Sequence, residues 1–273
     1  ANFNNKFFEN KENIINSILN FENGEQFYKD KGLEYQYGIM LSGEPGCGKT
    51  TFIKCVAQLT KRIIIIVKWT NQSNLEELSK LILGERIGDF AINHKKRLWV
   101  FEDIDAMGDI VRDRDLVEKD RKNKQKIILK MLKEPESPKN QILNPKIKDD
   151  NPENEKISAH NNLSTYLNAI QGIEESHGRM IISTTNKPET IDPAVMRPGR
   201  IDCHLIMKKA NRQVILENLN YYYNVSKTIN CIPTKLDYKY TMAEISGKCK
   251  NNESFETCLQ KLIFENEFKR KKH

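Results

Sequence analysis

The sequence contains no long apolar run, no closely paired cysteines and no internal repeat. No stretch approaches the roughly 18 consecutive apolar residues of a membrane span, so we expect no span within this chain. The six cysteines form no C-x-x-C pair and no metal-ligand spacing, which indicates free thiols in a reducing compartment such as the cytoplasm, a viral factory or a matrix-facing site. The chain also shows no DNA-reading helix, zinc module or RNA-binding motif, which disfavours a nucleic-acid reader.

The composition permits a packed core beneath a very polar surface. With 273 residues, 38% of them hydrophobic and 30% charged, the chain can form one large domain or a main domain with a smaller companion. The net charge of +7 suits an acidic partner such as nucleic acid or anionic lipid, and lysine-rich solvated faces explain the same charge. The chain begins at Ala1 rather than at methionine, so an upstream targeting or membrane segment can be missing and the compartment stays open.

The most informative stretch is a glycine-rich octapeptide, Gly43–Thr50, which has the spacing of a phosphate-binding P-loop. An apolar segment precedes it and a helical pattern follows it, an arrangement that directs backbone N–H groups and the helix dipole at one anion. We expect Lys49 at the β- and γ-phosphates of a nucleoside triphosphate and the Thr50 hydroxyl at Mg²⁺. The expected nucleotide-binding residues are Gly43, Glu44, Pro45, Gly46, Cys47, Gly48, Lys49, Thr50 and Thr51.

A cluster of acids follows a second apolar segment, in the order Phe101-Glu102-Asp103-Ile104-Asp105. Open parallel sheets bind their ligands beyond the carboxyl ends of the strands, which is where this cluster is expected to lie. A nucleotide–Mg²⁺ site needs one carboxylate near the metal and another that orients the attacking water. Glu102 and Asp103 are therefore candidate metal-binding and catalytic residues.

Polar residues also follow a third apolar segment. Asn186 ends the stretch Ser183–Asn186, where its amide can hold the lytic water against the γ-phosphate. Arg197 and Arg200 stand three residues apart around a Pro-Gly turn, so both guanidinium groups can reach one anion. A guanidinium directed at the γ-phosphate offsets charge that develops in the transition state. Surface salt bridges are the alternative role for these arginines.

Apolar segments alternate with helical patterns along most of the chain. This alternation predicts an α/β fold, in which a five-stranded parallel sheet carries helices on both faces and is followed by a small α-helical domain. The run Ile63–Val67 is β-branched throughout, which predicts a strand buried on both faces. The expected strands are 38–42, 63–67, 98–101, 179–184 and 203–207. The expected organisation is an N-terminal linker with helices at 1–37, an ATPase domain at 38–207 and a helical lid at 208–273.

A charged stretch interrupts this pattern at about 112–159. It is dominated by Lys, Asp, Glu, Asn and Pro, with a short apolar cluster near Gln125–Leu132. We expect a solvated insertion that is helical near the cluster and otherwise mobile. A partner-binding arm is the alternative.

Taken together, these motifs resemble the AAA family of ATPases over nearly all of 38–207. The stretch Ser183–Asp202 resembles the second region of homology that separates AAA proteins from other P-loop NTPases. Phe27–Tyr35, Phe101–Asp105 and Leu163–Gly172 resemble the mitochondrial branch that translocates the folded Rieske protein during complex III assembly, including its large-virus relatives. The resemblance implies ATP hydrolysis that remodels or translocates a protein substrate.

The resemblance also assigns roles at matching positions. Lys49 and Thr50 match the phosphate lysine and the Mg²⁺ hydroxyl, and Asn186 matches the first sensor. Glu102 stands where most members carry the metal-side Asp, and Asp103 stands where they carry the catalytic Glu. The acid pair is therefore swapped, which leaves the choice of catalytic base open.

Further roles concern other parts of the assembly. Arg197 and Arg200 match the arginine fingers, which in this family act on ATP bound by the neighbouring subunit. The resemblance therefore implies a homo-oligomeric ring of six or seven subunits, with ATP and Mg²⁺ as cofactors. Gly247 stands where the lid approaches the adenine in relatives. A nucleic-acid-stimulated AAA motor and a nucleotide-gated scaffold with little hydrolysis remain the alternative functions.

One departure from the family concerns substrate handling. Members that thread unfolded proteins carry an aromatic–hydrophobic–Gly pore loop after the second strand, whereas here only Lys68–Gln72 precedes the next helix. Trp69 can serve there as a substrate contact or as core or interface packing. We therefore do not expect simple threading of an unfolded chain.

Overall fold

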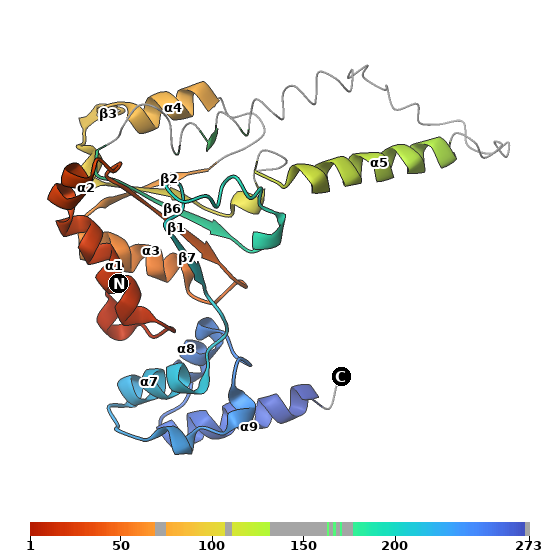
Figure 1. The fold of residues 1–273 in the computed structure, drawn as a ribbon. Helices are drawn as coiled ribbons and strands as arrows, with labels where there is room; N and C mark the ends of the chain where they lie inside the picture. Colours follow the sequence, from red (N-terminus) through yellow and green to blue (C-terminus); the bar gives the residue numbers. More distant parts are fainter. Residues whose placement is uncertain are drawn as a thin grey trace.

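The molecule is built on one parallel sheet, seen edge-on in Figure 1. A computed structural model describes residues 1–68, 75–106, 111–131, 163, 166–167, 170 and 177–270. The sheet has five strands in the order β2-β5-β6-β1-β7, all of them parallel, which confirms the predicted fold class. Its strands are β1 (Gln36–Ser42), β2 (Ile63–Val67), β5 (Arg97–Phe101), β6 (Arg179–Thr185) and β7 (Cys203–Ile206).

Helices surround the sheet and form a separate group after it. The described helices are α1 (Lys11–Asn23), α2 (Glu25–Lys31), α3 (Lys49–Thr60), α4 (Leu75–Leu83), α5 (Arg114–Met131), α7 (Arg212–Tyr223), α8 (Met242–Lys250) and α9 (Phe255–Arg270). A small hairpin consists of β3 (Arg86–Ile87) and β4 (Phe90–Ala91), and 3₁₀ turns occupy Phe3–Asn5, His94–Lys96, Ile104–Ala106, Pro188–Thr190, Ile229–Cys231 and Thr234–Leu236. None of these helices combines the length and apolarity that crossing a membrane requires.

The pleat of the central strands divides their side chains between two apolar cores. Leu98 and Val100 of β5 pack with α1 and α3 on one face of the sheet. Trp99 and Phe101 of the same strand pack with α4 on the other face. Because successive strand residues point to opposite faces, a continuous apolar run buries both faces of the sheet at once. Figure 1 shows α1 and α3 below the sheet and α4 above it.

The prediction that Ile63–Val67 is buried on both faces is wrong. The segment forms β2 as expected, but the side chains of Ile63 and Ile66 are 53% and 50% exposed. The physical reason is its place in the sheet, because β2 is an edge strand that pairs with β5 alone among the described strands. A β-branched run reports strand propensity, and it does not report the number of neighbouring strands.

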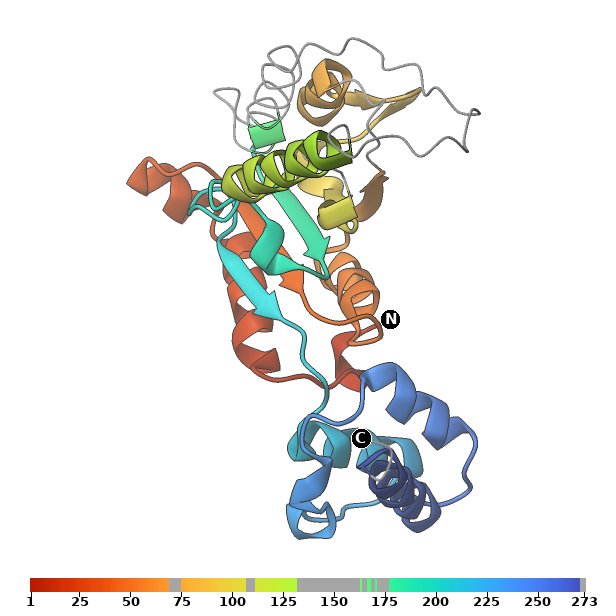
Figure 2. The ribbon, with the colours of Figure 1, turned by 90° about the vertical axis from the view of Figure 1, so that its right-hand side faces the viewer.

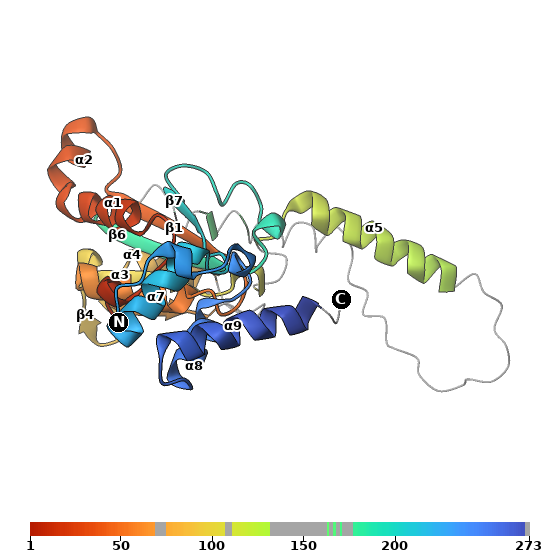
Figure 3. The ribbon, with the colours of Figure 1, turned by 90° about the horizontal axis from the view of Figure 1, so that it is seen from below.

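The insertion begins with a longer helix than the sequence predicts. Helix formation was expected only near Gln125–Leu132, whereas α5 extends from Arg114 to Met131 and projects away from the sheet (Figures 1 and 3). Asp113 caps it, because its carboxylate accepts hydrogen bonds from the backbone N–H groups of residues 115 and 116 at 2.8 and 3.3 Å. The rest of the predicted insertion, at 132–159, and the segment that contains Trp69 lie outside the described residues.

The C-terminal helices bury their own apolar cluster. Ile215, Leu219, Ile245 and Leu262 are fully buried among α7, α8 and α9, and this cluster shares no buried residue with the two cores of the sheet. Figure 2 shows these helices gathered at one end of the molecule. A helical group with its own core is what the predicted lid requires, and the boundary near 208 stays a prediction.

Candidate functional site

The P-loop connects β1 to α3 at the carboxyl end of the sheet. Helix α3 begins at Lys49, and its N-cap is Gly48, whose φ of 103° lies in the left-handed region that favours glycine. As a glycine, Gly48 has no side chain with which to cap this helix. The first N–H groups of the helix have no intrahelical acceptor, and together with the helix dipole they form a site for an anion.

Three predicted residues from separate segments meet beside this loop. The Lys49 ammonium donates to the Gly43 carbonyl at 2.5 Å and to the Asn186 side-chain oxygen at 2.7 Å. The Asn186 amide in turn donates to Asp103 Oδ1 at 3.2 Å. A continuous network thus links the loop after β1, the end of β6 and the end of β5.

The register of the sheet explains this meeting. Ser42 pairs with Thr185, so the residue after β6 lies beside the start of the P-loop. Phe101 pairs with Ser183, which brings the acid cluster to the same edge. The carboxyl ends of parallel strands therefore bring together residues that are far apart in the sequence.

The acid turn is also fixed through its backbone. Asp103 has a φ of 49°, in the left-handed region, and its N–H donates to the Thr184 hydroxyl at 2.8 Å. Asp105 accepts from the backbone N–H of Asn186 at 3.1 Å. Asp tolerates this backbone conformation better than most residues do. Of the predicted pair, exposed Asp103 is among the described residues that line the cleft, whereas half-buried Glu102 is not.

The network opens into a cleft of about 730 Å³ between the P-loop and α8. Most of the predicted nucleotide-binding residues line it, namely Pro45, Gly46, Cys47, Gly48, Lys49, Thr50, Thr51 and Gly247. The N terminus of α8 lies against the loop, since the Ala243 N–H donates to the Gly46 carbonyl at 3.2 Å. A capping box formed by Thr241 and Glu244 fixes that end of α8. The remaining predicted loop residues, Gly43 and Glu44, lie beside the cleft, as acceptors of Lys49.

One wall of the cleft was not predicted from the sequence. The segment Phe3–Phe8 contributes Phe3, Asn5, Lys6, Phe7 and Phe8 to the lining. It is held there by aromatic contacts, because the rings of Phe3 and Phe8 lie 5.5 and 5.7 Å from the ring of Phe52 on α3. The only signal in the sequence was the density of phenylalanine near the N terminus, and spacing alone does not reveal what these rings contact.

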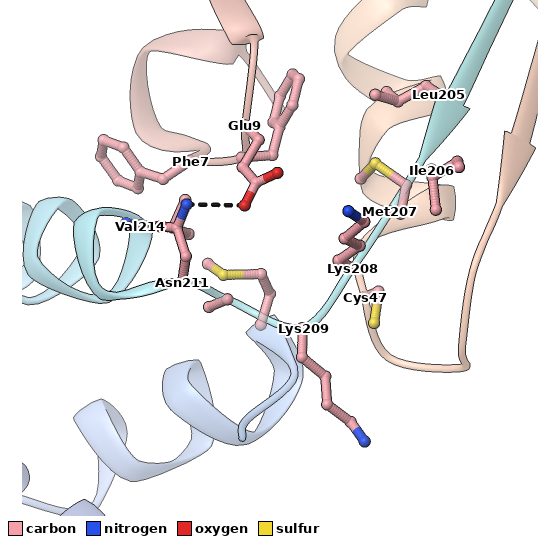
Figure 4. Close-up of a pocket in the computed structure, with 13 residues that line it drawn as sticks. Phe7, Glu9, Cys47, Leu205, Ile206, Met207, Lys208, Lys209, Asn211 and Val214 are labelled. Carbon is pink, nitrogen blue, oxygen red and sulfur yellow. Dashed lines mark hydrogen bonds between the residues drawn. The ribbon is translucent and has the colours of Figure 1, made fainter. Parts of the chain in front are cut away.

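Figure 4 shows how this N-terminal segment continues toward the C-terminal helices. Glu9 Oε1 accepts hydrogen bonds from the Asn211 amide at 2.8 Å and from the Tyr238 hydroxyl at 2.6 Å. Cys47 lies nearby and is only 2% exposed, and burial raises the pKa of its thiol. A buried thiol with a raised pKa is a packing residue rather than a reactive nucleophile.

The predicted arginine fingers lie on a loop outside the cleft. The Arg197 side chain is exposed, whereas Arg200 is half-buried and donates through Nη1 to the Ala194 carbonyl at 2.6 Å. Burial, and then the positive charge of Arg197, lower the pKa of the Arg200 guanidinium. Neither arginine is among the described residues that line the cleft.

A close backbone contact fixes the position of this loop. A Cβ atom on Gly38 would lie 1.7 Å from the Arg200 carbonyl oxygen, so the loop packs directly on β1. Gly38 is near the beginning of β1, and the P-loop follows the end of that strand at Ser42. Four strand residues span about 13 Å, which separates the Arg200 backbone from the P-loop of the same chain.

Comparison with known proteins agrees with this geometry. Residues 39–209 match the model of the ATPase family associated with various cellular activities, AAA. The chain belongs to the AAA family of ATPases. Its matched region is an ATP-hydrolysing enzyme domain, and it contains the P-loop between β1 and α3 described above.

Individual relatives of this AAA ATPase support the resemblance to the mitochondrial branch. An AAA-ATPase of Arabidopsis thaliana, At5g40000, is 32% identical over 71% of the chain and 35% of its own length. The probable mitochondrial chaperone BCS1-A of Dictyostelium discoideum is 27% identical over 87% of the chain and 48% of its own length. A putative AAA family ATPase of Acanthamoeba polyphaga mimivirus, L572, is 31% identical over 71% of the chain and 90% of its own length. The chain thus spans between a third and a half of the two cellular relatives.

Proposed function

We propose that this AAA ATPase binds ATP with Mg²⁺ in the cleft and hydrolyses it as one subunit of a homo-oligomer that remodels or translocates a protein. One observation carries the proposal: Lys49, Asn186 and Asp103 share the cleft, whereas Arg197 and Arg200 lie outside it. A phosphate that gains negative charge in the cleft therefore needs guanidinium groups from another copy. A head-to-tail ring supplies them at each cleft.

The chemistry of the cleft fits a triphosphate and a hard divalent cation. The uncapped N–H groups of α3 and the Lys49 ammonium are donors suited to phosphate oxygens. Thr50 and Asp103 line the cleft and half-buried Glu102 precedes Asp103 in the chain, and all three offer the oxygen ligands that Mg²⁺ prefers. Mg²⁺ held by these residues would neutralise charge on the phosphates.

The catalytic roles follow from the network at the strand ends. Asp103 lines the cleft, and we assign it the part of general base that accepts a proton from the attacking water. Asn186, which bonds to both Asp103 and Lys49, holds that water at the γ-phosphate. Asp103 is one methylene shorter than the usual Glu, and its left-handed backbone at the turn sets how far its carboxylate reaches into the cleft.

Mixed assemblies test the proposed sharing of sites. Lys49→Ala removes the phosphate-binding lysine and keeps both arginines. Arg200→Ala keeps that lysine and removes one arginine. Each variant alone should lose phosphate release by about a thousandfold, because an arginine acting in trans accelerates turnover by 10³ or more. In an equal random mixture, a cleft has Lys49 in half of the cases, and its neighbour has Arg200 in half of the cases. About a quarter of the clefts therefore combine both residues, so activity should return.

Two outcomes would redirect the proposal. If the mixture stays as inactive as its components, the arginines do not act across subunits. If the assembled wild-type protein releases phosphate no faster than the Lys49→Ala protein, the result favours a nucleotide-gated scaffold with little hydrolysis.

A protein is the substrate class that the relatives favour. The Dictyostelium relative is named a mitochondrial chaperone, and this supports a protein client for the present chain. The nucleic-acid motor predicts instead that DNA or RNA stimulates phosphate release and that the stimulation falls steeply with salt. We expect no such stimulation, because the cation-bearing helix α5 also carries acidic residues, among them Glu118 paired to Lys122 at 2.8 Å.

A further inference from the structure

The base of the projecting helix α5 is joined to the loop that carries the arginines. The Asp113 N–H donates to the Thr190 carbonyl at 2.8 Å, and the Asp192 N–H donates to the Val111 carbonyl at 2.8 Å. Residues 112 and 191 form an antiparallel bridge between these bonds. The two segments therefore behave as a short paired ribbon, and one of them, 190–192, lies between Asn186 and the arginines in the sequence.

A buried carboxylate extends this connection. Asp192 is only 2% exposed, and its Oδ2 accepts from Nε of exposed Arg114, the first residue of α5, at 2.9 Å. Its Oδ1 accepts from the Ala194 N–H at 2.8 Å. A carboxylate at this depth needs both a cation and hydrogen-bond donors, and Arg114 is the cation.

The connection ends at Arg200. The carbonyl of Ala194 accepts from Arg200 Nη1 at 2.6 Å, so both polar groups of the Ala194 residue are engaged. Three consecutive hydrogen bonds thus lead from Arg114 through Asp192 and Ala194 to Arg200. Hydrogen bonds that share groups in this way fix one another's geometry.

The far end of the same loop is fastened independently to β1. Asp202 Oδ2 accepts from the Gly38 N–H at 2.8 Å, and the Gln36 amide donates to the Gly199 carbonyl at 2.7 Å. These contacts hold the backbone around Arg200 and leave its side-chain direction to the Ala194 carbonyl. The orientation of the guanidinium therefore depends on the α5 side of the loop.

We propose that Arg114 is a positioning residue for Arg200, acting through Asp192 and Ala194, so that the placement of α5 sets the direction of the arginine offered to the neighbouring subunit. The inference rests on the proposed function, because Arg200 must act on ATP for its direction to matter. Helix α5 projects from the body (Figures 1 and 3), so a protein that displaces it would change ATP hydrolysis without touching the cleft.

Arg114→Ala tests the inference by phosphate release from the assembled full chain. We expect kcat to fall about tenfold, within the usual range of coupling effects, with the affinity for a fluorescent ATP analogue unchanged. Arg114→Lys should restore much of the rate, because it keeps the cation. Lys122→Ala is the matched control, since Lys122 pairs with Glu118 within α5 and should leave the rate at the wild-type value.

A second pair of variants separates positioning from stability. Arg114→Ala leaves the Asp192 charge buried and can lower the melting temperature, whereas adding Asp192→Asn removes that charge and keeps an oxygen for the Ala194 N–H. Positioning predicts that the double variant regains stability and stays slow. Full recovery of its rate would overturn the inference.

A third comparison distinguishes the failure of this inference from the failure of the proposed function. If Arg114 acts through Arg200, then Arg114→Ala should slow an Arg200→Ala protein no further. An additive loss overturns the inference and leaves the proposed function standing. Wild-type turnover by Arg200→Ala itself overturns the proposed function.

Discussion

The cleft and the arginine loop are bonded in different ways. In the cleft, Lys49, Asn186 and Asp103 bind one another and so hold polar groups that are suited to a ligand. In the loop, Arg200 bonds within its own turn, and Arg197 presents an exposed charge. Among the described residues, lysines line the cleft and no arginine does, whereas the two arginines lie on a loop that is not part of the lining.

Sheet order explains the difference. The P-loop follows β1, which lies between β6 and β7, so strands on both sides supply residues to the cleft. The arginine loop leads into β7, which lies at the edge of the sheet and, in the part of the chain that the structure describes, pairs with β1 alone. An edge is open to another molecule, and a central strand is not. In the proposed homo-oligomer, the cleft of one copy and the arginine loop of the next would form the two complementary parts of one site.

The largest expected effect comes from a substitution in the cleft alone. Lys49→Ala should weaken binding of a fluorescent ATP analogue by at least about a hundredfold, because it deletes the cation that is directed at the phosphates. The melting temperature should stay near that of the wild type. Lys54→Ala, an exposed lysine further along the same helix, is the control and should bind normally. Equal losses of ATP-analogue affinity in both variants would show a general effect of positive charge instead of specific phosphate binding by Lys49.

A comparable effect should separate the roles of the two acids that follow β5. Asp103→Asn should keep ATP affinity and lower turnover by about a hundredfold or more, the usual contribution of a general base. Glu102→Gln should chiefly raise the Mg²⁺ concentration needed for half-maximal turnover. Single-turnover phosphate release at several Mg²⁺ concentrations measures both quantities. The reverse pattern would assign the base to Glu102.

A substitution in β1 should displace the arginine loop and leave the cleft unchanged. In Gly38→Ala the new methyl group meets the Arg200 carbonyl, and backbone atoms on both sides must move. We expect a loss of about 1–3 kcal/mol in the free energy of unfolding, typical of overpacking. Thermal unfolding and ATP-analogue binding should show lower stability with nearly normal affinity. Unchanged stability would mean that the loop does not rest on β1 in solution.

The smallest expected effect concerns the N-terminal segment, which lines the cleft and bonds through Glu9 to the C-terminal part of the chain. Glu9→Ala removes the acceptor shared by Asn211 and Tyr238, so the N-terminal segment should hold the cleft less firmly. We expect KM for ATP to rise about three- to tenfold at constant kcat, the range for lost hydrogen bonds. Glu9→Gln keeps an acceptor oxygen and should stay close to wild type. A fall in kcat alone would place the role of Glu9 elsewhere.

Much of the fold could be predicted because local pattern and tertiary structure agree. All five strands appear where apolar segments were expected, and β1 starts only two residues before the predicted strand. The errors occur where neighbours decide the outcome. Ile63 and Ile66 are exposed because β2 lies at an edge, and α5 runs further toward the N terminus than its apolar cluster because Asp113 caps it.

The candidate site divides in the same way. The P-loop spacing led to Lys49, and the polar residues after apolar segments led to Asp103 and Asn186, because each belongs to a short pattern. Phe3, Gly38 and Asp192 could not be found in that manner. Their importance comes from contacts with Phe52, Arg200 and Arg114, which lie far from them in the chain.

The sequence by itself determined which segments form strands, which loop can bind phosphate and which side chains carry the required charges, because hydrophobic periodicity and short motifs are local properties. Only the tertiary structure decided that three of those side chains share one cleft and that two arginines lie outside it. Strand order and register bring distant residues together, and they depend on how the whole sheet packs.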